Sequence, residues 1–161
     1  MAAYIKWCIR VFIISSLFAN ALCCPSGWMT HGSSCYHFSH DTEDWIGALQ
    51  FCRELKGQLV EINDASENTF LEAEVKLRKN SFWIALSDVE EESTWIWMNS
   101  RQPLRSSSFN DWIPGQPDNY GADENCACIY SQANYQWNDY PCHENIHYIC
   151  EMADDSTEVV G

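Results

Sequence analysis

The sequence has little glycine, little proline and few basic side chains. Seven Gly and five Pro among 161 residues exclude a collagen-like, linker-like or broadly disordered chain. The hydrophobic share of 46%, with 14% aromatic residues, is enough for one sizeable core, so we expect one domain. Nine Lys and Arg face 23 Asp and Glu, a formal charge of −14, which would repel nucleic-acid phosphates. We therefore expect no nucleic-acid partner, and the carboxylates serve either solubility or the binding of a hard cation.

Long hydrophobic runs are also absent. The first 21 residues combine a weakly basic start, the apolar run 11–18 and small residues ending at Ala21, which predicts a secretory signal peptide. That run is far shorter than the roughly 18–20 residues of a spanning helix, and no later stretch is longer, so we expect no membrane insertion. The sequence thus predicts a secreted, extracellular protein with a domain over 22–151 and an acidic tail over 152–161.

Cysteine, by contrast, is abundant, with nine in the chain. Cys8 leaves with the predicted signal peptide, and eight remain. No Cys-x2-Cys pair has a partner pair, so these thiols indicate a disulfide framework rather than a zinc site. Eight cysteines allow about a hundred pairings, and counting alone assigns none of them.

The first half of the chain predicts a hairpin and two helices. Residues 24–38 suit a short hairpin stapled by cysteines. Residues 42–55 predict an amphipathic helix ended by Gly57. Its inner face would contain Trp45, Ala48, Leu49, Cys52 and Leu55.

A short strand over 59–62 leads to the second helix. Asn63 or Asp64 would cap that helix, which runs to about Arg78. Its inward residues would be Phe70, Leu71 and Val75.

The second half predicts strands around a long irregular segment. Strands are expected over 82–86, 94–97, 126–130 and 147–151, with 136–139 between the last two. The fold class is therefore α+β. Residues 99–125 lack periodicity, and an irregular segment of that length inside a compact domain is usually functional.

Side-chain oxygens cluster in three short segments of this second half. They are 116–120 (Gln-Pro-Asp-Asn-Tyr), 123–125 (Asp-Glu-Asn) and 137–139 (Trp-Asn-Asp). Each alone is ordinary turn chemistry or a solvated strand end. Together they offer the amide and carboxylate oxygens of a calcium site.

The sequence resembles the C-type lectin family from Cys24 to Glu151. The resemblance rests on motifs in family order: Cys24-Pro25-x-x-Trp28, Ser34-Cys35-Tyr36, Ala48-x3-Cys52, Trp83-Ile84-Ala85-Leu86, Gln116-Pro117-Asp118, Trp137-Asn138-Asp139, Cys142 and Cys150-Glu151. It implies a double-loop domain whose long loop binds Ca²⁺ as cofactor. It also implies the disulfides Cys24–Cys35, Cys52–Cys150 and Cys126–Cys142.

The same resemblance implies the ligands of the ion and of a sugar. The metal ligands would be Gln116, Asp118, Glu124, Asn138 and Asp139, and these side chains would also bind sugar hydroxyls that complete the coordination of about six to eight oxygens. In this family the order Gln-Pro-Asp accompanies galactose-type glycans, and Glu-Pro-Asn accompanies mannose-type ones. Tyr120 lies where galactose binders tend to carry an aromatic that packs on the sugar ring. Its alternative role is to cover the core as an ordinary loop aromatic.

A second calcium site could draw on a further set of oxygen donors. Its ligands would be Asp88, Glu92, Asn119, Glu124 and Asn125. The alternative is that the acidic run 90–92 is a solvated turn.

The favoured function is a calcium-dependent lectin for galactose or N-acetylgalactosamine, acting in glycan or microbial-surface recognition and thus in innate immunity. The alternative within the same fold is a module that binds protein, mineral or ice. His143 and His147 lie near Asp139 in sequence, as in some hydrolases, but no catalytic signature is present, so we expect no enzyme activity.

The three implied bridges leave Cys23 and Cys128 over. Cys23 lies near the mature N-terminus and could link two chains, which predicts a homodimer and the multivalency that weak sugar sites need. An intrachain Cys23–Cys128 bridge is the alternative. Cys128 could also be a small buried hydrophobe.

Overall fold

The computed structural model describes residues 24–153. The predicted signal peptide, Cys23 and residues 154–161 lie outside the described residues. The elements are β1 (Met29–His31), β2 (Ser34–Phe38), α1 (Trp45–Glu54), β3 (Gln58–Leu59), α2 (Ala65–Arg78), β4 (Phe82–Ser87), β5 (Ile96–Trp97), the 3-10 turn η1 (Tyr120–Ala122), β6 (Cys126–Ile129), β7 (Trp137–Tyr140) and β8 (His147–Ala153). The α+β class is confirmed. Neither helix in this range has the length and apolarity to cross a membrane.

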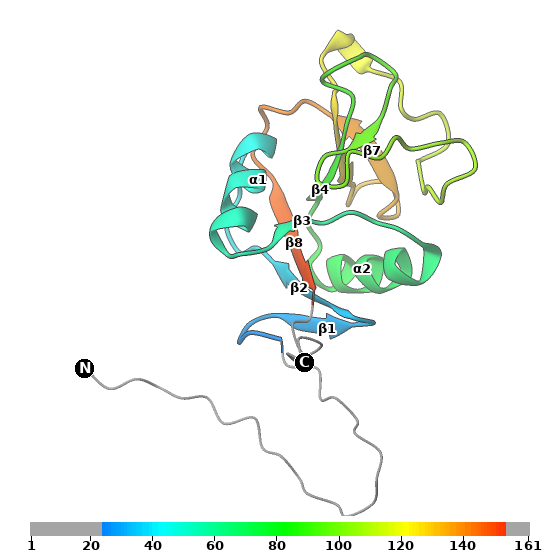
Figure 1. The fold of residues 1–161 in the computed structure, drawn as a ribbon. Helices are drawn as coiled ribbons and strands as arrows, with labels where there is room; N and C mark the ends of the chain where they lie inside the picture. Colours follow the sequence, from blue (N-terminus) through cyan, green and yellow to red (C-terminus); the bar gives the residue numbers. More distant parts are fainter. Residues whose placement is uncertain (1–23, 154–161) are drawn as a thin grey trace, which may run out of the picture.

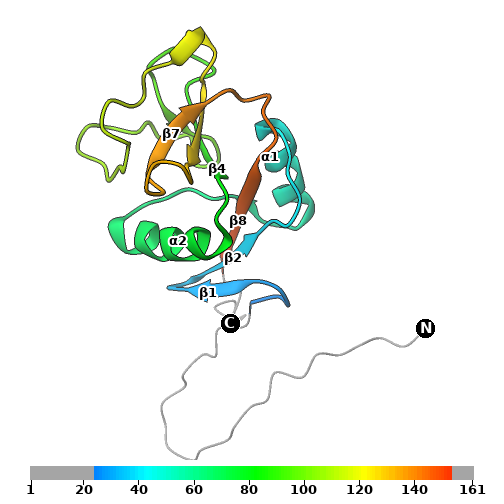
Figure 2. The ribbon, with the colours of Figure 1, turned by 180° about the vertical axis from the view of Figure 1, so that it is seen from behind.

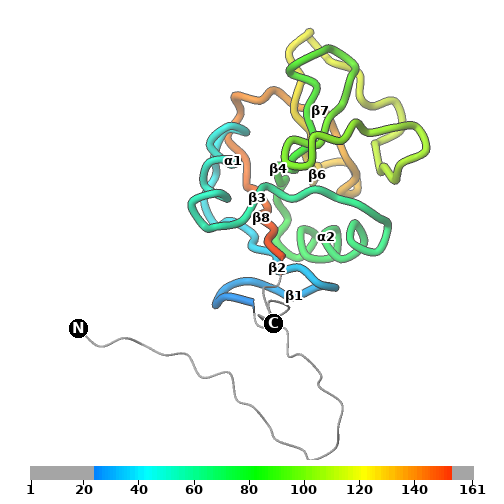
Figure 3. Tube along the Cα trace, viewed as in Figure 1, coloured from blue at the N-terminus to red at the C-terminus, as the bar shows by residue number. Residues whose placement is uncertain are grey.

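The strands form one mixed sheet. Their order is β1-β2-β8-β4-β6-β7, with β3 paired to β8 and β5 paired to β4. β4 and β8 run parallel, and the other pairs are antiparallel. Figure 1 shows β1, β2 and α2 in the lower part, α1 on the left beside β8 at mid-height, and β7 with the long loop in the upper part. The view from behind (Figure 2) and the trace in Figure 3 show the same division, so the loop lies at the end of the molecule opposite β1.

The stapled hairpin is confirmed. β1 and β2 pair antiparallel, and the Cys24–Cys35 disulfide, with a Cα–Cα distance of 5.5 Å, holds the segment before β1 to β2. The remaining implied disulfides, Cys52–Cys150 and Cys126–Cys142, are also present. The first of these joins α1 to the central strand β8 and closes 98 residues of chain.

Helix α1 begins later than the sequence predicts, at Trp45 instead of Thr42. The reason is a local cap, because the Asp44 side chain accepts a 2.7 Å hydrogen bond from the Gly47 N–H and so fixes the first turn. The helix buries most of the predicted face, namely Trp45, Ala48, Leu49 and Cys52. Leu55 was wrongly assigned to that face: it lies past the last turn and is 42% exposed.

Helix α1 ends before Gly57, as predicted, but Gly57 does not take the left-handed conformation common after a helix. Lys56 takes that conformation instead, with φ of 63°. Gly57 is required for another reason, since a Cβ there would lie 2.7 Å from the Glu151 carbonyl oxygen and 3.0 Å from the Trp28 ring. Its absent side chain lets the chain approach β8 closely.

Helix α2 matches its prediction at both ends. The Asp64 side chain caps it by accepting hydrogen bonds of 2.8 and 2.9 Å from the N–H groups of Ser66 and Glu67. Leu71 and Val75 are fully buried. Phe70 is only partly buried and packs against the core.

The strands differ from prediction mainly at their ends. β3 covers only Gln58–Leu59, although 60–62 are buried, and β5 covers only Ile96–Trp97. β7 was not predicted as a strand. It pairs with β6 in the register that places Asn138 opposite Cys128. β8 runs to Ala153, so the predicted tail boundary at 152 falls inside the sheet.

Candidate functional site

The long segment between β5 and β6 is irregular, as predicted, and contains only the turn η1. The backbone anchors it to β7: the N–H of Ile113 donates to the Trp137 carbonyl at 2.9 Å, and the N–H of Trp137 donates to the Asp111 carbonyl at 2.8 Å. The N–H of Gln116 then donates to the Ile113 carbonyl at 2.8 Å. This segment therefore approaches the site from a fixed position beside β7.

Three predicted ligands come together at this end of the molecule. Carboxylate oxygens of Asp118, Glu124 and Asp139 all lie within 4.8 Å of one another. Within residues 24–153 no other group of three or more acidic, His or Cys side chains converges in this way. Asp118 is exposed, Glu124 is half-buried and Asp139 is fully buried, so the cluster opens to solvent on one side.

Backbone donors hold these carboxylates in place. The Oδ2 atom of Asp139 accepts from the N–H groups of Asp118 at 2.9 Å and Asn119 at 2.7 Å. The Oε2 atom of Glu124 accepts from the N–H of Tyr120 at 3.0 Å. The loop backbone is thus tied to two predicted ligands, Asp139 on β7 and Glu124 in the loop itself.

Two of the five predicted ligands of the first site have a buried side-chain oxygen that lacks a hydrogen-bond donor. These oxygens are Oδ1 of Asp139 and Oε1 of Gln116, whose peptide bond to Pro117 is cis. Buried acceptors are normally paired, and a bound cation satisfies an oxygen as a donor would. The three converging carboxylates, one of which carries an unpaired oxygen, therefore fit a hard cation that prefers oxygen ligands, such as Ca²⁺.

The remaining predicted ligand, Asn138, is 8% exposed on β7. Its side-chain amide nitrogen donates to the backbone carbonyl of Asp139, and its side-chain oxygen is an acceptor. Asn138 lies next to the cluster because Asp139 directly follows it on β7. Tyr120 is 80% exposed, which excludes the alternative that it covers the core and leaves its ring free for a ligand.

The second predicted set lies against the same cluster. A hollow of about 130 Å³ is lined by residues that include Asp88, Glu92, Asn119, Asp118 and Asp139. The Asn119 side chain donates to Oε2 of Glu92 at 2.6 Å. Oδ1 of Asp88 is buried and unpaired. Asn125 contributes its backbone carbonyl to this region by accepting from the Asp88 N–H at 3.2 Å.

Burial raises the pKa values of three carboxylates in this region, those of Asp139, Glu124 and Asp88. The pKa of Asp139 is raised by burial, opposed by the N–H groups of Asn119 and Asp118. Burial also raises the pKa of Glu124, against the hydrogen bond from the Tyr120 N–H, and nearby carboxylates raise it further. The pKa of Asp88 is raised by burial and lowered by the Ser93 N–H. The ionised cluster is therefore costly without a cation.

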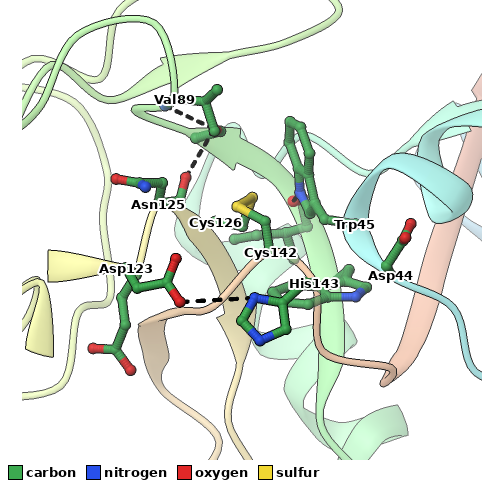
Figure 4. Close-up of a disulfide and its surroundings, with 12 residues drawn as sticks. Asp44, Trp45, Val89, Asp123, Asn125, Cys126, Cys142 and His143 are labelled. Atoms are coloured by element: carbon green, nitrogen blue, oxygen red, sulfur yellow. Dashed lines mark hydrogen bonds and ion pairs between the residues drawn. A yellow bond between two sulfur atoms is a disulfide. The ribbon is translucent and has the colours of Figure 1, made fainter. Parts of the chain in front are cut away.

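The Cys126–Cys142 disulfide ties the two strands of the site together. It joins the start of β6, two residues after Glu124, to the segment that follows β7. Figure 4 shows this bond with Asp123 and His143 beside it. These two side chains form an exposed pair with 3.8 Å between Nδ1 and the carboxylate. His147 instead lies in β8 against Phe82, so the two histidines do not form one site.

Sequence reasoning missed the residues that support the site. Asn68 in α2 is 3% exposed and accepts a 2.9 Å hydrogen bond from the indole of Trp137, which directly precedes Asn138. The Asn68 amide also donates to Asp111 at 3.0 Å. A signal was available, because Asn68 lies three residues before Leu71 on the predicted inner face, where a polar side chain must find partners.

The comparisons with known proteins agree on one family. The family model described as "Lectin C-type domain" matches residues 41–152. A "Perlucin-like protein" from Mytilus galloprovincialis is 33% identical, over 88% of this chain and 94% of that protein. A "C-type lectin domain family 4 member E" from Mus musculus is 37% identical, but this chain spans only 62% of its length and is itself covered over 83%.

Solved structures give the same result. The carbohydrate-recognition domain of a mouse scavenger receptor C-type lectin superimposes with a TM-score of 0.73 at 36% identity, covering 82% of this chain and 98% of that chain. A calcium-independent type II antifreeze protein also superimposes, with a TM-score of 0.72 at 26% identity over 83% and 96% of the two chains. The same fold thus occurs in proteins of quite different description.

Proposed function

Since this chain belongs to the C-type lectin family, we propose that it is a calcium-dependent lectin for galactose-type glycans. The observation that carries the proposal is the convergence of Asp118, Glu124 and Asp139 within 4.8 Å, and the buried unpaired oxygens of Asp139 and Gln116 support it. With Asn138, these residues make up the proposed metal ligands.

The roles of the residues follow from their exposure. The buried Asp139, held by two backbone N–H groups, supplies a fixed negative charge at the base of the site. The more exposed Asp118 and Glu124 are open to solvent and can accept hydrogen bonds from sugar hydroxyls. A bound Ca²⁺ would supply the open coordination positions that two neighbouring sugar hydroxyls fill.

The proposed preference for galactose rests on the order of two side chains. Gln116 carries an amide that can donate, whereas Asp118 carries a carboxylate that only accepts. The diol of the sugar therefore meets donors at one end of the site and acceptors at the other. The exposed ring of Tyr120 would pack on the apolar face of the sugar.

A second calcium ion would bind in the adjacent hollow. Its proposed ligands are Asp88, Glu92, Asn119, Glu124 and Asn125. The unpaired Oδ1 of Asp88 supports this proposal. The 2.6 Å hydrogen bond between Asn119 and Glu92 would open or rearrange when that ion binds.

The alternative is a module that binds protein, mineral or ice without sugar. The antifreeze protein of the same fold, described as calcium-independent, supports this alternative. The convergence of three carboxylates within 4.8 Å, one of them buried with an unpaired oxygen, favours the calcium-dependent lectin, because such a cluster is costly without a cation.

We further propose that the domain over 22–151 is secreted after removal of residues 1–21, and that Cys23 links two chains. Electrophoresis of the secreted protein with and without reductant tests the dimer, with Cys23→Ser as control. A wild-type protein that migrates as a monomer without reductant contradicts it.

The lectin proposal is tested by chromatography on immobilised galactose. We expect the wild-type protein to be retained in calcium and released by a chelator or by free galactose. Retention that persists in chelator, or no retention on galactose and mannose resins alike, contradicts the proposal and favours the alternative.

A further inference from the structure

Helix α2 contacts the candidate site through one buried amide. Asn68 is 3% exposed, and both polar atoms of its side chain form hydrogen bonds. Its Oδ1 accepts from the Trp137 indole at 2.9 Å, and its Nδ2 donates to Glu72 at 2.8 Å and to Asp111 at 3.0 Å. In both views α2 lies below the lobe that carries β7 and the long loop (Figures 1 and 2).

Two of the three hydrogen-bond partners of Asn68, Trp137 and Asp111, lead along the chain to proposed calcium ligands. Trp137 precedes Asn138 and Asp139 on β7. Asp111 is fixed to the same strand, because its carbonyl accepts from the Trp137 N–H at 2.8 Å and its carboxylate accepts from Gln136 at 3.1 Å. The chain then runs from Asp111 to Gln116, the first of the proposed ligands.

The Trp137 indole is rigidly enclosed. It is fully buried, and three rings meet it edge-on: Trp97 at 5.8 Å, Phe109 at 5.8 Å and Trp112 at 5.9 Å between centroids. Aromatic packing alone permits small rotations of the ring, whereas a hydrogen bond from its N–H fixes the direction. Asn68 supplies that bond.

We propose that Asn68 is a positioning residue for the calcium site. Its side chain binds both the Trp137 indole and the Asp111 carboxylate. It thereby fixes the position of β7 relative to the segment 111–116, so that the ligand oxygens in both lie close together. Residues that orient metal ligands without touching the metal typically change metal affinity roughly 10- to 100-fold when they are replaced. The inference rests on the proposed function, because it assumes that calcium binds at this cluster.

The test compares two deletions of buried hydrogen bonds made by neighbouring residues of α2. Asn68→Ala removes the bonds toward the site. Tyr36→Phe removes the 2.7 Å bond from the Tyr36 hydroxyl to Glu67, which points to β2, away from the site. We expect Asn68→Ala to raise the calcium dissociation constant roughly 10- to 100-fold and Tyr36→Phe to leave it almost unchanged, although both lower the melting temperature without calcium.

An exchange of the two polar partners keeps the proposal testable if Asn68→Ala fails to fold. Asn68→Asp alone places a carboxylate against Asp111 and Glu72 and should weaken calcium binding. In the double variant Asn68→Asp with Asp111→Asn, the amide at position 111 can donate to the carboxylate at position 68 and still accept from Gln136. We expect the double variant to bind calcium more tightly than Asn68→Asp.

Calcium affinity is measured by isothermal titration calorimetry, at a temperature where circular dichroism shows that each variant is folded. A wild-type protein that binds no calcium refutes the proposed function itself. If the wild type binds, the positioning role is refuted by Asn68→Ala with wild-type affinity, by Tyr36→Phe losing as much affinity as Asn68→Ala, or by an exchange variant no better than Asn68→Asp.

Discussion

The Oδ2 atom of Asp139 accepts a 2.9 Å hydrogen bond from the backbone N–H of Asp118. A buried carboxylate on β7 thereby holds the loop residue whose own carboxylate lies on the exposed side of the cluster. The rigid strand and the irregular loop are coupled at this contact, so changes at Asp139 should affect both the charge of the site and the position of the loop.

Replacing Asp139 by Asn removes one charge while keeping nearly the same shape. We expect calcium affinity to fall more than about 100-fold, because calcium sites are tuned over several orders of magnitude by the charge of their ligands. Calorimetric titration measures the loss. The matched control is Asp123→Asn, an exposed carboxylate outside the cluster, which should bind calcium like the wild type. Equal losses in the two variants would show that general surface charge, not this cluster, attracts the ion.

The stabilisation by calcium should depend on pH. Burial raises the folded-state pKa values of Asp139, Glu124 and Asp88. Without calcium, these groups therefore bind protons more readily in the folded state than in the unfolded state, and the free energy of unfolding falls as pH rises through their folded pKa values. Calcium needs the ionised forms, so it stabilises the protein most near neutral pH.

Thermal unfolding with saturating calcium and with a chelator, at a series of pH values, measures this effect. The difference in melting temperature should shrink on acidification and disappear once these carboxylates are protonated, at a pH above that expected for unperturbed carboxyl groups. A difference that stays constant down to the ordinary carboxylate pKa of about 4 would contradict the assignment of these residues.

Sugar preference should follow the two residues that flank Pro117. The double variant Gln116→Glu with Asp118→Asn exchanges the acceptor and donor ends of the site. We expect it to bind calcium and to prefer mannose over galactose on a glycan array. A variant that binds calcium normally and still prefers galactose would show that other residues determine the preference.

Cys128 should be inert in the native protein. It is fully buried in β6 and forms no bridge with any described cysteine. Burial, together with the nearby carboxylates of Asp139 and Glu124, raises the pKa of its thiol, and the thiolate is the reactive form. Iodoacetamide should therefore modify Cys128 only after denaturation, as mass spectrometry can show. Protection that persists in denaturant without reductant would instead indicate the Cys23–Cys128 bridge.

Much of this fold could be predicted from spacing and caps. Asp64 is a good N-cap residue and precedes apolar residues at helical spacing. These two signals predicted the extent of α2 correctly. β7 could not be predicted in this way, because its four residues are largely polar. It is a strand because it pairs with β6 and because Trp137 packs in the core. The late start of α1 depends on the Asp44 side chain, which caps the helix. Hydrophobic periodicity does not show which of several neighbouring acidic residues is the cap.

The site, too, could be predicted only in part. Its ligand side chains could be identified from residue type and from resemblance to a family. The N–H groups of Asp118 and Asn119 that donate to Asp139 belong to the backbone. Every residue except proline has such a group, so residue type could not predict these contacts. Asn68 lies far from the ligands in sequence and acts through tertiary contacts, and only its polar character on a buried face hinted at a role.

The most direct test of the account is a crystal structure determined with calcium and galactose. We predict an ion with oxygens of Asp118, Glu124 and Asp139 at about 2.3–2.6 Å, and two sugar hydroxyls completing its coordination next to Tyr120. An ion bound elsewhere with this cluster unliganded, or galactose bound away from the ion, would contradict it.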